Sequence, residues 1–175
     1  SINYAQTIQK AILPEAEEIK KAFPDSFILF RPRDIVSGDF YWFKQKGNRK
    51  YIAAADCTGH GVPGAFMSMI SNTLLHEIVD SKNIVRPSDI FDEIKKEIVR
   101  SLKQTGSVGE NKDGMDIALC MLEGDTLEYA GANNPLWIIN RGELTAIKGD
   151  SQPVGISYGE AKKFTNHSIQ LEQGS

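Results

Sequence analysis

The chain has 175 residues, of which 41% are hydrophobic and 25% charged, and its formal net charge is −3. This length and composition predict one soluble globular domain whose core needs no disulfide bonds. Acidic and basic residues are mixed without a basic run, which argues against nucleic acid as a partner. We expect no membrane span, because no apolar stretch approaches the required ~20 residues. We expect no signal peptide, because the start of the chain lacks a basic segment followed by an apolar one. We therefore expect a cytoplasmic protein, with Cys57 and Cys120 as reduced core residues.

The N-terminal residues predict a helix that enters a larger domain. Apolar residues at helical spacing favour an entry or linker helix within residues 1–20. Pro14 interrupts this pattern, so the helix is expected to end near Leu13 and a second short turn to follow. Residues 21–175 are expected to form the domain itself. The chain lacks an initiator methionine, so we expect it to be a piece of a longer protein.

Strands are expected next, at residues 26–32, 39–45 and 51–57, where apolar and β-favouring residues gather. Residues 46–50 have turn chemistry, which predicts a hairpin between the second and third strands.

The apolar period then changes to that of helices. Apolar residues spaced by four predict a helix from Pro63 to about Val79, and a stronger helix over 86–104 with Ser88 as its N-cap. Strands in an antiparallel meander are expected to follow, with loops at 105–114 and 150–160; their ranges are 115–123, 126–132, 135–140, 143–149 and, after the second loop, 162–172. Strands, two helices and strands again indicate an α+β layered domain, not a doubly wound parallel sheet.

Two aspartates lie at the ends of neighbouring predicted strands. Asp39 begins one strand and Asp56 ends the next. A buried carboxylate is unfavourable unless it is neutralised, and Mg²⁺ or Mn²⁺, which prefer oxygen ligands, would neutralise it. If the strands form a hairpin, both carboxylates reach one pocket. This pattern favours metal-assisted hydrolysis of a phosphate ester.

Glycines surround these aspartates and a histidine. Gly38, Gly59 and Gly61 would let the backbone approach ions and a phosphate closely. The helix that begins near Pro63 would direct its N-terminal amides toward the same place. His60 between two glycines would be accessible, as a catalytic residue must be.

Simpler structural roles exist for each of these residues and remain open from the pattern alone. Asp39 could be a turn aspartate, Asp56 a capping residue and His60 an ordinary loop residue. Asp116 could cap a loop or bind a distant cation, and Asn133 and Asn134 are most simply a hairpin turn.

Six segments together resemble one protein family. They occur in the family's order and spacing through nearly the whole chain: "AQTIQKAILP" (5–14), "FRPRDIVSGDFYWF" (30–43), "AAADCTGHGVPGAFMSM" (53–69), "DGMDIALCMLE" (113–123), "LEYAGANNPLWII" (127–139) and "GDSQPVGI" (149–156). The chain therefore resembles the bacterial SpoIIE/RsbU-type serine phosphatases of the PP2C (PPM) superfamily.

The resemblance implies a PP2C-like β-sandwich of antiparallel sheets flanked by helices, with two Mn²⁺ or Mg²⁺ ions between the sheets. It implies hydrolysis of phosphoserine or phosphothreonine on a regulatory protein, such as an anti-sigma-factor antagonist, under control of an N-terminal sensor domain. Carried over by position, it implies these roles: Asp39 and Asp56 as metal ligands with Asp56 as the bridge, the Cys57 carbonyl as a further ligand, Gly59, His60 and Gly61 around the phosphate, and Asp116 as an outer metal residue.

The chain departs from the family pattern in two places. Ser37 stands where the family usually has glycine, which is a small change. No residue matches the family's later acidic motifs, so we expect the domain to lack its last strand or strands and helix. Two carboxylates would bind a cation weakly, and this chain would be weak or inactive. An exposed sheet edge would favour a homodimer or other self-association. The alternative function is a phosphatase-like domain that binds a phosphoprotein without hydrolysing it.

Overall fold

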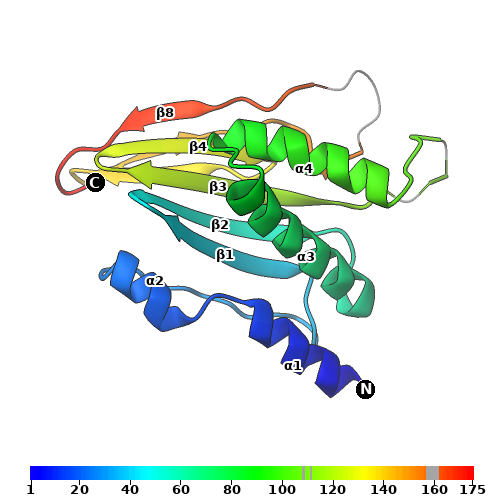
Figure 1. The fold of residues 1–175 in the computed structure, drawn as a ribbon. Helices are drawn as coiled ribbons and strands as arrows, with labels where there is room; N and C mark the ends of the chain where they lie inside the picture. Colours follow the sequence, from blue (N-terminus) through cyan, green and yellow to red (C-terminus); the bar gives the residue numbers. More distant parts are fainter. Residues whose placement is uncertain (108, 111, 157–161) are drawn as a thin grey trace.

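The computed structural model describes residues 1–107, 109–110, 112–156 and 162–175. Its centre is an antiparallel sheet in the order β1–β2–β3–β4–β8, with β7 paired to β3 (Figure 1). A separate sheet consists of β5 and β6. The strands are β1 (Asp39–Lys46), β2 (Arg49–Cys57), β3 (Gly114–Glu123), β4 (Thr126–Ala132), β5 (Leu136–Asn140), β6 (Glu143–Ile147), β7 (Val154–Gly155) and β8 (His167–Gln170). The predicted hairpin is confirmed as β1–β2.

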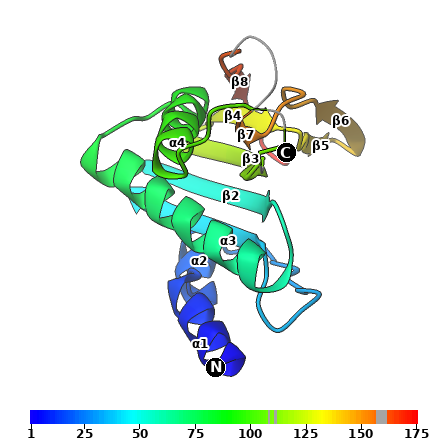
Figure 2. The same ribbon diagram turned by 90° about the vertical axis from the view of Figure 1, so that its right-hand side faces the viewer.

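One face of the large sheet is covered by helices (Figures 1 and 2). They are α3 (Gly61–His76), the short π-helix η1 (Glu77–Ser81) and α4 (Pro87–Ser101). The main core lies between these helices and the sheet, where Trp42 and Ile117 are fully buried. The predicted α+β class is confirmed.

Pro14 separates α1 (Ile2–Ile12) from α2 (Ala16–Ala22), as predicted.

The opposite face of the sheet has other neighbours. Ile19 of α2 packs on Phe43 of β1, and β5–β6 packs on the far side of the same face. A hollow of about 620 Å³ lies on this face, between residues 27–31 and strands β1, β2 and β3. In the part of the chain that the structure describes, no helix is long and apolar enough to span a membrane.

The prediction of a strand at residues 26–32 is wrong. These residues are in neither a helix nor a strand, and Phe27 and Leu29 are 88% and 74% exposed. Side-chain type predicted the strand, but a strand also needs a neighbour for its backbone hydrogen bonds. No described segment pairs with this one.

Three smaller predictions are also corrected. Ser88 is not the N-cap of α4: Arg86 takes that position in an extended conformation, because Pro87 favours the first helical position. The meander breaks after β4, which pairs with β8; among the described residues, β5 pairs with β6 and with no other strand. The last strand, predicted over residues 162–172, is shorter and covers β8 (His167–Gln170). Residues 108, 111 and 157–160 of the two predicted loops, and residue 161 after the second loop, lie outside the described residues.

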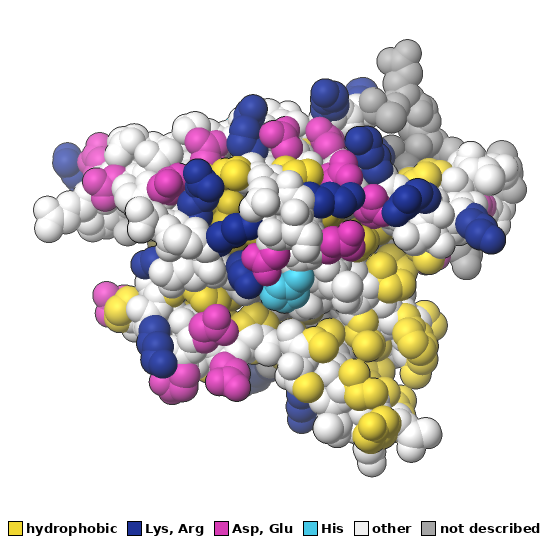
Figure 3. Space-filling model, viewed as in Figure 1, with side chains coloured by type: hydrophobic (Ala, Val, Ile, Leu, Met, Phe, Trp, Pro, Cys, Tyr) yellow, Lys and Arg dark blue, Asp and Glu magenta, His cyan; other side chains and the backbone are white. Residues whose placement is uncertain are grey.

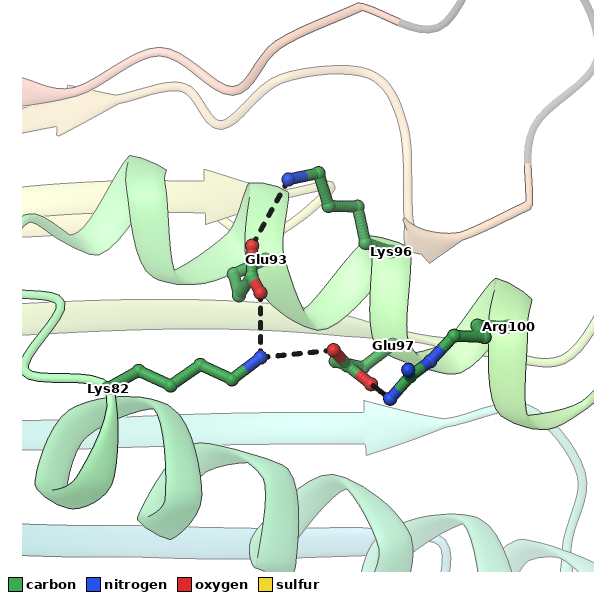
Figure 4. Close-up of polar contacts among 5 residues, drawn as sticks. All are labelled: Lys82, Glu93, Lys96, Glu97 and Arg100. Atoms are coloured by element: carbon green, nitrogen blue, oxygen red, sulfur yellow. Dashed lines mark hydrogen bonds and ion pairs between the residues drawn. The ribbon is translucent and has the colours of Figure 1, made fainter.

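A charged network joins the segment after η1 to α4 (Figure 4). The Lys82 Nζ lies 2.7 Å from Glu93 Oε1 and 3.0 Å from Glu97 Oε1, and Lys96 and Arg100 contact the same glutamates. The hydrogen bonds to Lys82 lower the pKa of both glutamates. The stabilisation from this network is therefore present at neutral pH and is lost as the pH falls through the lowered glutamate pKa values.

The two cysteines are free and buried, as predicted. Burial raises the pKa of each thiol to about 12, from an ordinary value of 9.0. We expect neither thiol to react with Ellman's reagent at pH 8 in the folded protein, and both to react in guanidinium chloride. Because the folded pKa is raised, the free energy of unfolding should fall as the pH rises from about 9 toward 12. Rapid native labelling at pH 8 would contradict this burial.

Candidate functional site

Three aspartates form a row across neighbouring strands at one end of the sheet. Asp56 at the end of β2 is paired with Asp39 of β1 on one side and with Asp116 of β3 on the other. Cross-strand partners point to the same face of a sheet. Tyr41 and Ala54 follow in alternation on that face, which is the face opposite α3 and α4. The hairpin thus brings together two aspartates that are 17 positions apart in the sequence.

The electrostatics of Asp56 reflect this arrangement. Its pKa is raised by burial first, and then by a hydrogen bond to Asp39 and by the charge of Asp39. Two carboxylates that face one another are unfavourable as a doubly ionised pair, and a divalent cation would remove that penalty.

The donor chemistry of Asp39 and Asp56 therefore fits Mn²⁺ or Mg²⁺, both of which prefer oxygen ligands. The fit is limited to these two carboxylates. Among the described residues, no three His, Cys, Asp or Glu side chains are placed to hold one metal ion together. The carboxylate of Asp116 thus belongs to the row but not to the position between Asp39 and Asp56.

Backbone segments meet closely behind the acidic pair. A Cβ on Gly38 would lie 2.8 Å from the Cys57 carbonyl oxygen and 2.9 Å from that of Gly59. A Cβ on Gly64 would lie 2.5 Å from the Gly59 carbonyl oxygen. The Cys57 amide donates a hydrogen bond to the Gly38 carbonyl, at 3.2 Å. Glycine is therefore required at Gly38 and Gly64 for the loop after β2 to pack against the start of β1.

A cavity of about 180 Å³ opens beside the two carboxylates at the N-terminus of α3. His60 is the N-cap residue of α3 and is three-quarters exposed, with its Nδ1 3.4 Å from Asp34 Oδ2. The free amides at the start of a helix favour an anion. The cavity is lined by Arg33, Asp34, Val36, Ser37, Gly38, Asp39, Asp56, Gly59, His60 and Gly61.

Most residues singled out from the sequence meet at this cavity. Asp39, Asp56, Gly59, His60 and Gly61 all line it. The other two lie beside it: Cys57 has a buried side chain and a carbonyl against Gly38, and Asp116 is one strand away from Asp56.

Two charged residues of the cavity, Arg33 and Asp34, were missed from the sequence. They lie inside the segment "FRPRDIVSGDFYWF" (30–43) that carries the family resemblance, and their place shortly before Asp39 was the available signal.

Gln9 of α1 is a third residue that the sequence did not reveal. Its side chain is buried and holds both backbone groups of Ser37: Nε2 donates to the Ser37 carbonyl at 2.6 Å, and Oε1 accepts from the Ser37 amide at 2.9 Å. Nε2 also lies 2.9 Å from Ser68 Oγ of α3. The first helix is thereby tied to the loop that leads into β1 and Asp39.

Residues 46–175 match the family model described as Stage II sporulation protein E (SpoIIE). The match covers more than half of the chain. The chain belongs to the SpoIIE family. The expected resemblance to SpoIIE/RsbU-type PP2C domains is thus confirmed, and the acidic row lies in a PP2C-type phosphatase fold.

Solved structures support this SpoIIE-family fold. The SiaA-PP2C domain of Pseudomonas aeruginosa is 28% identical with a TM-score of 0.82, over 98% of this chain and 66% of that chain. The RsbU and RsbW domains of Rv1364c from Mycobacterium tuberculosis are 20% identical with a TM-score of 0.62, over 81% of this chain and 38% of that chain. The PP2C phosphatase domain of SpoIIE from Bacillus subtilis, with a fragment of its regulatory domain, is 19% identical with a TM-score of 0.60, over 78% of this chain and 39% of that chain. The last two show the fold alone. No curated protein sequence matches the chain.

Proposed function

We propose that this SpoIIE-family domain takes part in metal-dependent hydrolysis of phosphoserine or phosphothreonine on a regulatory protein, as the output domain of a signalling protein. The observation that carries the proposal is the pairing of Asp39 with Asp56 beside a cavity at a helix N-terminus. Acidic ligands and an anion site next to one another suit a cation and a phosphate ester together. The family and the PP2C-type fold support the same reaction class.

In this proposal, some residues bind the cations and others form the wall of the cavity. Asp39 and Asp56 hold Mn²⁺ or Mg²⁺, with the Cys57 carbonyl as a further ligand, and two ions serve the reaction. A bound cation of this kind polarises a phosphoryl oxygen and lowers the pKa of water. Gly59 and Gly61 keep the wall of the cavity free of side chains.

Two side chains complete the proposed cavity. Arg33 adds a positive charge that attracts the phosphate. His60 lies accessible at the rim, where it can hold or deliver a proton.

The proposed partners follow from the same reading. The substrate is a phosphorylated regulatory protein, such as an anti-sigma-factor antagonist, and an N-terminal sensor domain controls the reaction in the cytoplasm. Self-association as a homodimer would cover apolar surface that gathers over α1 and the start of α3 (Figure 3). The exposed apolar side chains of these two elements are Ile2, Tyr4, Ile8, Val62 and Phe66.

A phosphatase assay with a phosphoserine peptide and Mn²⁺ tests the proposal. We expect slow release of phosphate that requires Mn²⁺ and is abolished by Asp39→Asn, because only two carboxylates hold the cation. Asp89→Asn is the matched control, since Asp89 lies in the first turn of α4, away from the cavity. Phosphate release that is equal in wild type and Asp39→Asn would contradict the proposal.

The second candidate is a phosphatase-like domain that binds a phosphoprotein without hydrolysing it. The absence of a third carboxylate at the cation position, among the described residues, favours this candidate. Mn²⁺-dependent binding of the phosphopeptide with no phosphate release would establish it in place of the enzyme.

A further inference from the structure

Asn133 follows β4 in a backbone conformation that the surrounding structure fixes. Its φ is 57°, in the left-handed region that asparagine tolerates better than most residues. Its amide donates to the Asp150 carbonyl at 2.8 Å, and the Asp150 amide donates to the Gly131 carbonyl at 2.8 Å. A parallel bridge joins Asn133 to Ile117, the neighbour of Asp116 in β3. A simple hairpin turn would not need these links to a third segment.

The Asn133 side chain points to the acidic row. Its Nδ2 donates a hydrogen bond to Asp116 Oδ1 at 2.8 Å. A neutral amide fixes the direction of a carboxylate without neutralising its charge, whereas lysine or arginine would do both. The contact thus holds Asp116 in place without adding a positive charge beside it.

We propose that Asn133 is a positioning residue that holds Asp116 as the outer carboxylate of the row, where Asp116 contacts a second divalent cation beside the one at Asp39 and Asp56. This inference rests on the proposed function. It accounts for the contact of the Asn133 side chain with Asp116, the strand partner of Asp56. Partners that orient metal ligands typically change metal affinity by 10–100-fold when they are removed.

Glycine is the substitution that isolates the side chain of Asn133. Alanine at φ 57° would add backbone strain, whereas glycine adopts this conformation freely. Asn83 provides a matched control, since its φ is 53° and its side chain contacts Lys46, away from the acidic row. Any general effect of replacing a left-handed asparagine by glycine appears in Asn83→Gly as well.

The experiment is a Mn²⁺ titration of the whole chain, followed by calorimetry and by the electron paramagnetic resonance of free Mn²⁺. We expect Asn133→Gly to weaken Mn²⁺ binding by about 10-fold or more, and Asn83→Gly to bind as wild type does. In an Asp116→Asn background, Asn133→Gly should change the affinity by no more than about twofold, because the two residues act as one unit.

Two results would overturn the inference while leaving the inner cation position intact. One is Mn²⁺ binding by Asn133→Gly that equals wild type while Asp39→Asn binds more weakly. The other is a loss in Asn133→Gly that persists undiminished in the Asp116→Asn background. If wild type and Asp39→Asn bind Mn²⁺ equally, or wild type binds none, the proposed cation site fails and this inference fails with it.

Discussion

Replacement of Gly64 by alanine is expected to lower the free energy of unfolding by about 2 kcal/mol and to weaken Mn²⁺ binding. In an ordinary helix this change would be stabilising by about 1 kcal/mol, because alanine is the better helix former. Here the new Cβ would lie 2.5 Å from the Gly59 carbonyl oxygen and 3.1 Å from the Gly38 Cα. Both neighbours are backbone, so α3 or the loop after β2 must move. Urea unfolding and Mn²⁺ titration measure the two effects.

Gly61→Ala is the control for the mechanism of this loss. A Cβ at Gly61 has open space, with Asp34 Oδ2 as its nearest neighbour at 3.9 Å, but φ there is +61°. This variant should lose only about 1–2 kcal/mol, from backbone strain. A Gly64→Ala protein as stable as wild type would show that the helix start and the loop are not in close contact.

Trp42→Ala is expected to have the largest effect on stability, a loss of about 3–5 kcal/mol. Trp42 is fully buried between the sheet and α3. Its ring centroid lies 5.3 Å from that of His76 and 6.4 Å from that of Tyr51. Such a loss is a large part of the ~5–15 kcal/mol that typically stabilises a domain. Equilibrium unfolding in urea, followed by far-ultraviolet circular dichroism, measures it.

The chain supplies a matched control in its other tryptophan. Trp137 is 68% exposed, so Trp137→Ala should change the free energy of unfolding by no more than about 0.5 kcal/mol. Trp42→Phe should be milder than Trp42→Ala, because Nε1 has no hydrogen-bond partner among the described residues and phenylalanine keeps much of the packing. Equal losses in Trp42→Ala and Trp137→Ala would place Trp42 outside the core.

The sequence predicted features that depend on local pattern. The β1–β2 hairpin followed from turn residues between two apolar runs, and the meeting of Asp39 with Asp56 followed from the hairpin. The helix that starts beside the cavity followed from the change in apolar period after the second glycine. In each case, residues close in the chain determine the outcome.

Features that depend on distant partners were not predictable. Gln9 looks like an exposed polar position on a helix, and only the packing of α1 against Ser37 and Ser68 gives it a buried role. Asn133 has the residue type of a turn, which concealed its contact with Asp116. Residues 26–32 have strand composition, but no described segment pairs with them.

The two-residue turn between β1 and β2 has a consequence at the opposite end of the hairpin. Gly47, with φ +59°, and Asn48 join strands that pair without interruption from Lys46 and Arg49 to Asp39 and Asp56. A single residue inserted in this turn, with the hairpin kept regular, would offset every pair by one position, so that Asp39 and Asp56 would no longer be partners. The length of this turn, at the far end of the hairpin, therefore determines whether the two carboxylates face one another.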